Sequence, residues 1–397
     1  MIPVDKATEI VLSNLIECKN TSLQLNQTIG GILKEPIIAD RDFPPYNRIT
    51  MDGIAILYAP YAEGQRSFSV ADIAPAGSPQ KTLLNPKDCI EVMTGAILPE
   101  GTDTVIRYED VCIENGIAQI NEPVVEGQNI HYQGEDRKKG SVVINAGRQI
   151  SPAEIGVAAT VGKAQLQVSK LPKAIIISTG DELVEIDEQP LAHQIRKSNV
   201  HRLQATLSKW GLETDRLHLM DDKNQIEVIL EDVLKNYPIV VMSGGVSKGK
   251  FDFIPGALDA LGVEKLFHKI QQRPGKPFWF GRSPKTGSVV FALPGNPVSS
   301  FMCVQRYMRP WLDASLGQSV ARPFAILKED VTFKPDLTYF MQVKIEYHTD
   351  GKIFAIPVHG HGSGDLANLV DADGFLELTQ GKDFYKAGEV YPLWLYR

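Results

Sequence analysis

Two spacings of apolar residues alternate along this chain and predict different elements. Between residues 4 and 18 the apolar residues recur every three or four positions, as on one face of a helix. From residue 52 to about residue 133, short apolar runs such as IAILYA and CIEVM are separated by glycine and proline. The first spacing predicts an N-terminal helix, and the second predicts an all-β segment with frequent turns.

Beyond a proline-containing hinge at residues 170–173, strands and helices are predicted to alternate. The strands lie at 174–178, 214–219 and 239–242, and the helices at 199–210, 225–235 and 255–261. A hairpin at 278–295 and an amphipathic helix from Pro297 follow. This alternation predicts a three-layer domain with a parallel sheet, whose ligand site lies at the carboxyl ends of the strands. Residues 322–397 return to β-type spacing and predict a separate β domain.

The composition is that of a globular protein. Of 397 residues, 43% are hydrophobic and 22% are charged, so a sizeable core is expected. The 41 basic and 48 acidic residues give a net charge of −7, which disfavours a nucleic-acid-binding protein. The four cysteines form no CxxC pair and fit reduced thiols. Because the sequence shows no signal peptide and no apolar run of about 18 residues, we expect a soluble, cytoplasmic protein without a membrane partner.

Three glycine-containing loops follow predicted strands of the α/β domain. They are Ser178–Leu183 (STGDEL), Ser243–Ser247 (SGGVS) and Pro294–Ser299 (PGNPVS). Glycine allows backbone N–H groups to approach a ligand, and the N-terminus of a following helix favours an anion. Each loop alone could be an ordinary turn. Because all three leave the same sheet at its carboxyl edge, together they predict a binding rim.

Carboxylates accompany these loops. At or just beyond the predicted strand ends lie Asp181, Glu182, Asp221, Asp222 and Asp252. Such a cluster can hold a hard divalent cation through oxygen ligands, although the paired aspartates could instead cap the helix that follows them. An anion-binding rim beside these carboxylates suits a phosphate ester with its Mg²⁺.

Cations on a proline-rich turn extend this prediction. The segment RPGKP places Arg273 and Lys276 where they could neutralise an anionic ligand or simply be solvated. Among other polar positions, Asp52 precedes a glycine and could initiate a turn. No GxSxG or GxxxxGK[ST] motif is present, so neither covalent serine catalysis nor a Walker-type NTPase is indicated.

Seven fragments in one order resemble the MoeA family of molybdopterin molybdenumtransferases, which includes the E domains of gephyrin and of a plant homologue. The fragments span essentially the whole chain and are PPYNRITMDGIAI, MTGAILPEGTDTVI, GEDRKKG, STGDEL, SGGVSKGKFDF, RPGKPFWFG and LPGNPVSS. The resemblance implies a multidomain α/β plus β fold. Its parts would be an elongated helical and extended dimerisation domain (1–48 and 138–170), an inserted small β domain (49–137), a three-layer α/β molybdopterin-binding domain (171–316) and a C-terminal β-barrel-like domain (317–397).

The resemblance also implies an activity. The enzyme would insert molybdate into adenylylated molybdopterin, release AMP and form molybdenum cofactor, assisted by Mg²⁺. A second copy of the chain, an adenylyltransferase and molybdoenzyme chaperones are the implied partners. The alternatives are a non-catalytic molybdopterin-binding scaffold and a molybdopterin adenylyltransferase. The complete acidic set favours the transferase over the scaffold, and the two β domains favour it over the adenylyltransferase.

Residue roles follow from the matched motifs. The resemblance implies catalytic roles for Asp52, Glu182, Asp222, Asp252 and Lys276. Glu182, Asp222 and Asp252 would hold the metal. The implied substrate-binding positions are Thr94, Asp136, Ser178, Gly180, Asp181, Ser243, Gly244, Gly245, Ser247, Arg273, Pro294, Gly295, Asn296, Pro297 and Ser363. Of these sets, Asp52, Thr94 and Asp136 would reach in from the partner subunit.

Some positions depart from the family pattern, among them Asn47–Thr50, Ile54 and one segment of the C-terminal domain. LTYFMQVKIE lacks an arginine that relatives often have on this strand. The contribution of the C-terminal domain to the pocket therefore stays open at this point.

Overall fold

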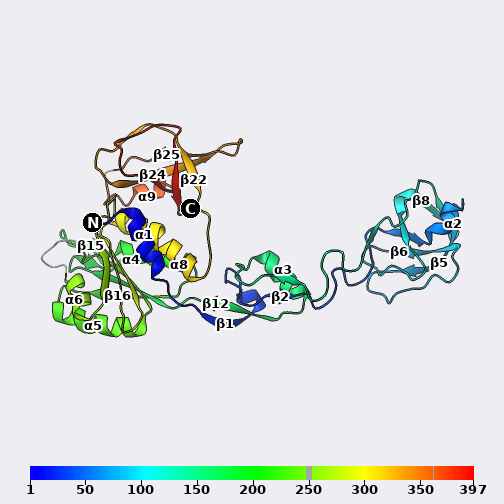
Figure 1. Ribbon diagram of the computed structural model, residues 1–397, viewed down its shortest axis with the longest axis horizontal. Coiled ribbons are helices and arrows are strands. Elements are labelled where there is room, and N and C mark those ends of the chain that lie inside the picture. The colour runs from blue at the N-terminus through cyan, green and yellow to red at the C-terminus, as the bar shows by residue number, and fades with distance from the viewer. Residues whose placement is uncertain (247–252, 361) are drawn as a thin grey trace. The chain divides into compact units, whose positions relative to one another are not determined.

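The protein divides into two compact units (Figure 1). The structure, a computed structural model, describes residues 1–246, 253–360 and 362–397. Unit 1 comprises Met1–Thr21 and Ser169–Arg397, and unit 2 comprises Ser22–Val168. Within the described ranges no helix is long and apolar enough to cross a membrane.

The main sheet of unit 2 has six strands in the order β7-β4-β6-β5-β9-β8. The strands are β4 (Gly53–Ile56), β5 (Ser67–Ala74), β6 (Asp88–Val92), β7 (Thr104–Arg107), β8 (Val111–Glu114) and β9 (Ile117–Ile120), and helix α2 (Tyr58–Ala62) follows β4. Successive side chains of a strand point to opposite faces, so Ala55 enters one hydrophobic cluster while Ile54 and Ile56 enter another. The prediction of a β domain in this region is confirmed.

Short strand pairs and one helix make up the rest of unit 2 and its boundary with unit 1. The pairs are β1 (Lys19–Gln24) with β12 (Gln165–Lys170), β2 (Ile37–Ile38) with β11 (Val142–Ile144), and β3 (Arg48–Ile49) with β10 (Ile130–His131). Helix α3 (Pro152–Thr160) begins with a capping box. The Ala153 N–H donates to Ser151 Oγ at 3.2 Å, and the Ser151 N–H donates to Glu154 Oε2 at 2.9 Å.

Unit 1 contains a six-stranded sheet in the order β16-β13-β17-β21-β20-β18. The strands are β13 (Ala174–Thr179), β16 (Thr214–Leu219), β17 (Ile239–Ser243), β18 (Glu264–His268), β20 (Trp279–Arg282) and β21 (Val289–Leu293). The first four in sheet order are parallel, whereas β20 is antiparallel to β21 and β18 is antiparallel to β20. The predicted parallel sheet is therefore confirmed for four strands, and the predicted hairpin, formed by β20 and β21, reverses the chain direction at one edge.

Helices cover both faces of this sheet (Figure 1). On one face lie α1 (Val4–Ser13), α4 (Ser198–Lys209), α7 (Pro297–Cys303) and α8 (Arg309–Ser315), with the π-helix Val304–Met308 joining the last two. On the other face lie α5 (Lys223–Asn236) and α6 (Ile254–Ala260). Because alternate strand residues point to the two faces, Ile176 and Val241 pack against the first group and Ile177 and Val240 against the second. The predicted three layers are confirmed.

A closed barrel forms the C-terminal part of unit 1. Its strands are β22 (Phe324–Leu327), β24 (Thr338–Tyr347), β25 (Ile353–Pro357), β26 (Gly374–Leu378) and β28 (Val390–Leu395), and the short β19 (Gln272–Arg273) adds to β24. Pairing of β24 with β26 closes the ring. Smaller elements are β14 (Leu183–Val184) with β15 (Ile195–Arg196), β23 (Val331–Thr332) with β27 (Phe384–Tyr385), and α9 (Asn368–Asp371).

A buried ion pair joins the π-helix to the barrel. Arg306, 2% exposed, donates from Nε to Glu377 Oε2 at 2.9 Å and from Nη2 to Glu377 Oε1 at 3.2 Å. The indole N–H of Trp394 donates to the same carboxylate at 2.7 Å. Losing one partner of such a pair leaves an uncompensated buried charge, so this contact helps to hold the barrel against the α/β sheet.

Candidate functional site

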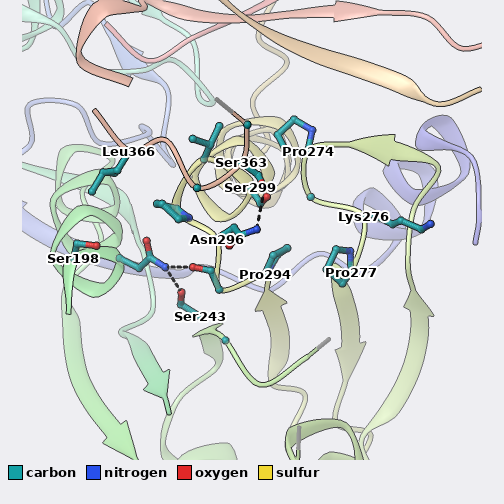
Figure 2. A pocket seen from close by; sticks show the side chains of 18 of the residues that line it. Ser198, Ser243, Pro274, Lys276, Pro277, Pro294, Asn296, Ser299, Ser363 and Leu366 are labelled. Atoms are coloured by element: carbon teal, nitrogen blue, oxygen red, sulfur yellow. Dashed lines mark hydrogen bonds between the residues drawn. The ribbon is translucent and has the colours of Figure 1, made fainter. Parts of the chain in front are cut away.

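A cavity of about 1190 Å³ lies in unit 1, at the carboxyl edge of the parallel strands and beneath loops of the barrel. Its wall includes residues from all three loops that follow β13, β17 and β21. Figure 2 shows Ser243 and Pro294 at strand ends, with Ser198 to one side and Lys276 and Pro277 to the other. The strand-end loops predicted to form a rim therefore do lie together.

Strand register explains why the loops meet. Ser178 pairs with Ser243 across β13 and β17, and Ser243 pairs with Leu293 across β17 and β21. Parallel strands in this register end at the same level of the sheet, so the chain leaves each strand toward the same space.

The two glycines after β17 are required by close packing. Gly244 and Gly245 have φ of +101° and +70°, a region that side chains rarely adopt. A Cβ atom at Gly245 would lie 2.7 Å from Cγ1 of Ile254 and 3.0 Å from Oγ1 of Thr179. One at Gly244 would lie 2.9 Å from the same Thr179 hydroxyl. Glycine therefore lets the loop backbone turn tightly beside the end of β13.

Asn199, near the start of α4, bonds to two of the loops. Its Nδ2 donates to Ser243 Oγ at 2.9 Å and to the Gly295 carbonyl at 2.6 Å (Figure 2, dashed lines at Ser243). We did not select this residue from the sequence, where it stood only at the start of a predicted helix. A polar residue in the first turn of a helix that follows a basic stretch was the available signal.

The barrel reaches the cavity through its own loops. Asn296 Nδ2 donates to Ser363 Oγ at 2.8 Å, and the Val298 N–H donates to the Ser363 carbonyl at 3.2 Å (Figure 2). Two aromatic rings of the barrel, Phe333 and Tyr339, also line the cavity and stack with centroids 4.2 Å apart. The C-terminal domain thus contributes both polar and aromatic surface, which settles the question that its sequence left open.

The two predicted cations, Arg273 and Lys276, line the cavity on a supported turn. Gln272, fully buried, donates from Nε2 to the Gly275 carbonyl at 3.0 Å and accepts from the Tyr307 hydroxyl at 2.5 Å. These bonds hold the turn from inside the protein, so the cations sit on a defined backbone rather than on a free surface loop.

The predicted carboxylates separate into two groups. Glu182 lines the cavity, and a Cβ atom at Gly180 would lie 2.3 Å from its Oε2. Asp181 and Asp222 are not among the described lining residues. Asp181 Oδ1 accepts the Asp221 N–H at 3.0 Å, and Asp222 Oδ1 accepts the Gln225 N–H at 3.2 Å, so Asp222 begins α5 in the capping role left open by the sequence.

Only some of the predicted metal ligands lie within the described residues. Asp252 and Ser247 lie outside the described residues. Within the described ranges, no group of three or more histidine, cysteine or carboxylate side chains is arranged to hold a metal ion. The assignment of Glu182, Asp222 and Asp252 as ligands stays a prediction.

Of the other predicted substrate-binding positions in unit 1, most line the cavity and two do not. Ser178, Ser243, Gly244, Pro294, Gly295, Asn296, Pro297 and Ser363 line the cavity. Gly180 and Gly245 are not among its described lining residues, although both shape the loops that form the wall.

The remaining predicted residues belong to unit 2. Asp52 Oδ1 accepts the Thr94 N–H at 2.5 Å, and hydrogen bonds from Thr94 lower the pKa of Asp52. Asp136 Oδ1 lies 3.0 Å from Nε2 of His131, whose Nδ1 lies 3.1 Å from Nη2 of Arg48. Within unit 2 the structure brings Asp52 and Thr94 into direct contact.

Two polar residues near β13 were missed in the sequence. His218 on β16 pairs with Ser178 on β13, and its Nδ1 lies 2.9 Å from Ser178 Oγ. Lys197 lines the cavity, is 8% exposed and forms an ion pair with Glu185 at 2.6 Å. The pairing of β16 with β13 places His218 beside the site, which the linear sequence does not show, whereas Lys197 stands in the basic stretch just before the predicted helix.

The chain matches known proteins along its whole length. Models of the MoeA N-terminal region (domain I and II), a probable molybdopterin binding domain and the MoeA C-terminal region (domain IV) match residues 2–162, 175–314 and 325–396. A Synechocystis sp. protein named molybdopterin molybdenumtransferase is 39% identical, with 99% of this chain and 100% of the relative covered. A Bacillus subtilis protein of the same name is 30% identical, with coverage of 100% and 94%. The crystal structure of the molybdopterin biosynthesis moeA protein from Pyrococcus horikoshii OT3 aligns over 100% of both chains, with TM-score 0.85 and 28% identity.

Proposed function

Because this chain belongs to the MoeA family, we propose that it catalyses the reaction for which its relatives are named, the transfer of molybdenum to molybdopterin. The protein is an enzyme of molybdenum cofactor biosynthesis. The substrates in this proposal are molybdate and adenylylated molybdopterin, and the products are molybdenum cofactor and AMP.

One observation supports the proposal most directly. A single cavity has the glycine-containing rim on the strand ends and the cations Arg273 and Lys276 on its wall. Molybdate, the pterin phosphate and the adenylate are all anions, and each needs backbone N–H groups or cationic side chains for its charge. The cavity therefore offers binding groups for two anionic reactants at once.

The chain's own residues act mainly by positioning and by neutralising charge. The loop at Ser243 and Gly244 binds phosphate oxygens, while Arg273 and Lys276 hold molybdate and the charge that develops on the leaving AMP. Phe333 and Tyr339 exclude water from the end of the cavity near Arg273. Holding both reactants in one enclosed space makes the reaction effectively intramolecular.

A divalent cation fits the donors of this cavity. Glu182 is the one carboxylate among its described lining residues, and serine hydroxyls and asparagine amides line the same cavity. Mg²⁺ in proteins commonly binds one or two carboxylates together with substrate phosphates. Glu182 would hold the ion, with Asp252 and Asp222 as the further predicted ligands, and the bound ion would polarise the phosphoanhydride.

We also propose the assembly and setting in which this occurs. The enzyme works as a homodimer in the cytoplasm, and Asp52, Thr94 and Asp136 of one copy complete the site of the other. The observation that supports a joint role is the hydrogen bond from the Thr94 N–H to Asp52 Oδ1, which holds two of these residues together. Its substrate comes from an adenylyltransferase, and its product passes to molybdoenzyme chaperones.

The test is AMP release from adenylylated molybdopterin in the presence of Mg²⁺ and molybdate. Wild-type protein should release AMP only when molybdate is added. Lys276→Ala and Glu182→Gln should each lower the rate by roughly 10- to 1000-fold, because each removes charge stabilisation at the reacting groups. Lys235→Ala and Glu231→Gln are matched controls, since these residues form an exposed ion pair on α5, and should leave the rate unchanged.

Other outcomes would replace this proposal with an alternative. Tight binding of the adenylate without AMP release would support a scaffold. Formation of the adenylate from ATP and molybdopterin would support an adenylyltransferase. Equal rates in Lys276→Ala and wild-type protein would show that the wall of this cavity does not take part in the reaction.

A further inference from the structure

Arg202 on α4 places a guanidinium group directly behind the cavity wall. Its Nη2 donates to Asn199 Oδ1 and to Ser300 Oγ, both at 2.9 Å. Its Nε and Nη1 are buried, and neither has a hydrogen-bond partner. The guanidinium carbon lies 5.2 Å from the centroid of the Phe301 ring.

The charge of this group is not compensated. In the described part of the chain no carboxylate forms an ion pair with Arg202, and burial alone lowers its pKa to about 10. The side chain is therefore still a cation at neutral pH. Burying a cation without a counter-ion is costly, and a long apolar side chain could fill the same space at a lower cost.

Hydrogen bonds connect this cation to the anion-binding rim. Because Asn199 accepts from Arg202 through its oxygen, its Nδ2 is directed to Ser243 Oγ and the Gly295 carbonyl. On the other side, the Ser300 hydroxyl donates to the Pro297 carbonyl at 3.1 Å. The guanidinium thus connects to the loops that follow β17 and β21 through one intervening residue on each side, Asn199 or Ser300.

We propose that Arg202 is a positioning residue whose buried positive charge strengthens the binding of a phosphate group at this rim. It orients the Asn199 amide and adds positive potential to a region sheltered from solvent. A bound phosphate would supply the missing counter-charge. The identity of the ligand, a phosphate ester, rests on the proposed function, whereas the role of Arg202 does not depend on the molybdenum chemistry.

The experiment compares AMP with adenosine, which has the same base and sugar but no phosphate. Calorimetric titration of the full-length protein gives both dissociation constants for wild type, Arg202→Gln, Arg202→Lys and the exposed control Arg216→Gln. Arg202→Gln should weaken AMP binding roughly tenfold and leave adenosine binding unchanged, because only the phosphate interacts with the lost charge. Arg202→Lys should keep most of the AMP preference, and Arg216→Gln all of it.

Thermal unfolding of each variant without ligand separates this role from a structural one. A structural arginine would lower the unfolding temperature on substitution and affect both ligands equally, which would overturn the proposal. An equal loss of AMP preference in Arg202→Lys would also overturn it, because lysine keeps the charge. If wild-type protein binds AMP no better than adenosine, the anion-binding role of the rim fails too. If AMP preference is present but insensitive to Arg202, only this inference fails.

Discussion

His218 lies on the edge strand β16, and its imidazole contacts Ser178 of the cavity wall. Its Nδ1 contacts Ser178 Oγ at 2.9 Å, and its Nε2 is buried without a hydrogen-bond partner. Burial is the main cause that lowers the pKa of His218, and the nearby positive charge of Lys197 lowers it further. A hydrogen bond with Ser178, and the weaker effects of the carboxylates Glu185 and Asp181, act in the opposite direction. The neutral imidazole is therefore the form that the folded protein prefers.

This preference predicts a loss of stability in mild acid. Above about pH 6.5 the histidine is neutral in both states, so its contribution does not change with pH. As pH falls below that value, the unfolded chain takes up the proton first, and stability declines until the lower folded-state pKa is reached. Urea unfolding between pH 5 and 7.5 should show the decline, at most about 1.4 kcal/mol per pH unit for one proton, and His218→Gln should flatten it.

The exposed His193 provides the control for this measurement. His193→Gln should leave the slope of stability against pH as in wild type. Identical slopes in wild type and His218→Gln would mean that other groups cause any acid destabilisation.

Residues at the site differed in how well they could be predicted from sequence. Gly244, Arg273 and Ser363 stood in recognisable motifs, and the structure places all three on the cavity wall. His218 and Arg202 could not be found in this way. The first depends on which strand lies beside β13, and the second on the helical turn that brings it next to Asn199.

The helical segment from α7 to α8 changes its winding where it supports the site. Residues Val304–Met308 form a π-helix, which widens the helix by one residue per turn. Tyr307 within it is buried, and its hydroxyl donates to Gln272 Oε1. Through Gln272 this element holds the turn that bears Arg273 and Lys276.

Removing that hydroxyl should loosen the turn. Tyr307→Phe leaves the buried Gln272 oxygen without its donor, which should lower the free energy of unfolding by about 1–3 kcal/mol. It should also raise KM for molybdate in the AMP-release assay more than it lowers kcat. The exposed Tyr347, substituted in the same way, should change neither quantity. A destabilised variant with unchanged KM would show that the turn does not depend on this bond.

At the element scale, periodicity predicted most helices and strands of the α/β sheet in unit 1 but not their irregular parts, and for the barrel it predicted only that the segment is β. The amphipathic helix from Pro297 was predictable, whereas the π-turn was not, because it depends on contacts of Arg306 and Tyr307 with distant residues. Strand β18 was also missed, since only its pairing with β20 makes it part of the sheet. The direction of β20 follows from the hairpin, which short-range sequence signals did indicate.

At the scale of the whole molecule, the predicted site residues lie in two different compact units. Lys276 and Glu182 belong to unit 1, whereas Asp52 and Thr94 belong to unit 2. The sequence allowed the order of the regions to be predicted from the change between β-type and α/β-type spacing. Whether Asp52 and Thr94 act in the site of their own chain or in that of a second copy cannot be found from spacing, because both cases have the same sequence.

Mixed dimers test the proposal that the site is shared between copies. If Asp52 acts in the partner's cavity, a dimer of one Asp52→Asn chain and one Lys276→Ala chain contains one intact site of two. Differently tagged chains, co-expressed and purified through both tags, should recover about half of the wild-type AMP-release rate. Mixed dimers of Glu182→Gln with Lys276→Ala should stay inactive, because both residues lie in unit 1. Inactivity of the first mixture would show that Asp52 serves the site of its own chain.

Helix α1 packs in the core of unit 1 against residues that are synthesised much later. Trp311 donates its indole N–H to the Asn14 carbonyl across 297 positions of the chain. At about 5–20 residues per second, a ribosome needs roughly 15–60 s to travel between them. Residues 22–168, which form one contiguous compact unit, are synthesised within this interval. The apolar face of α1 therefore gains its contacts with α8 only at the end of that interval.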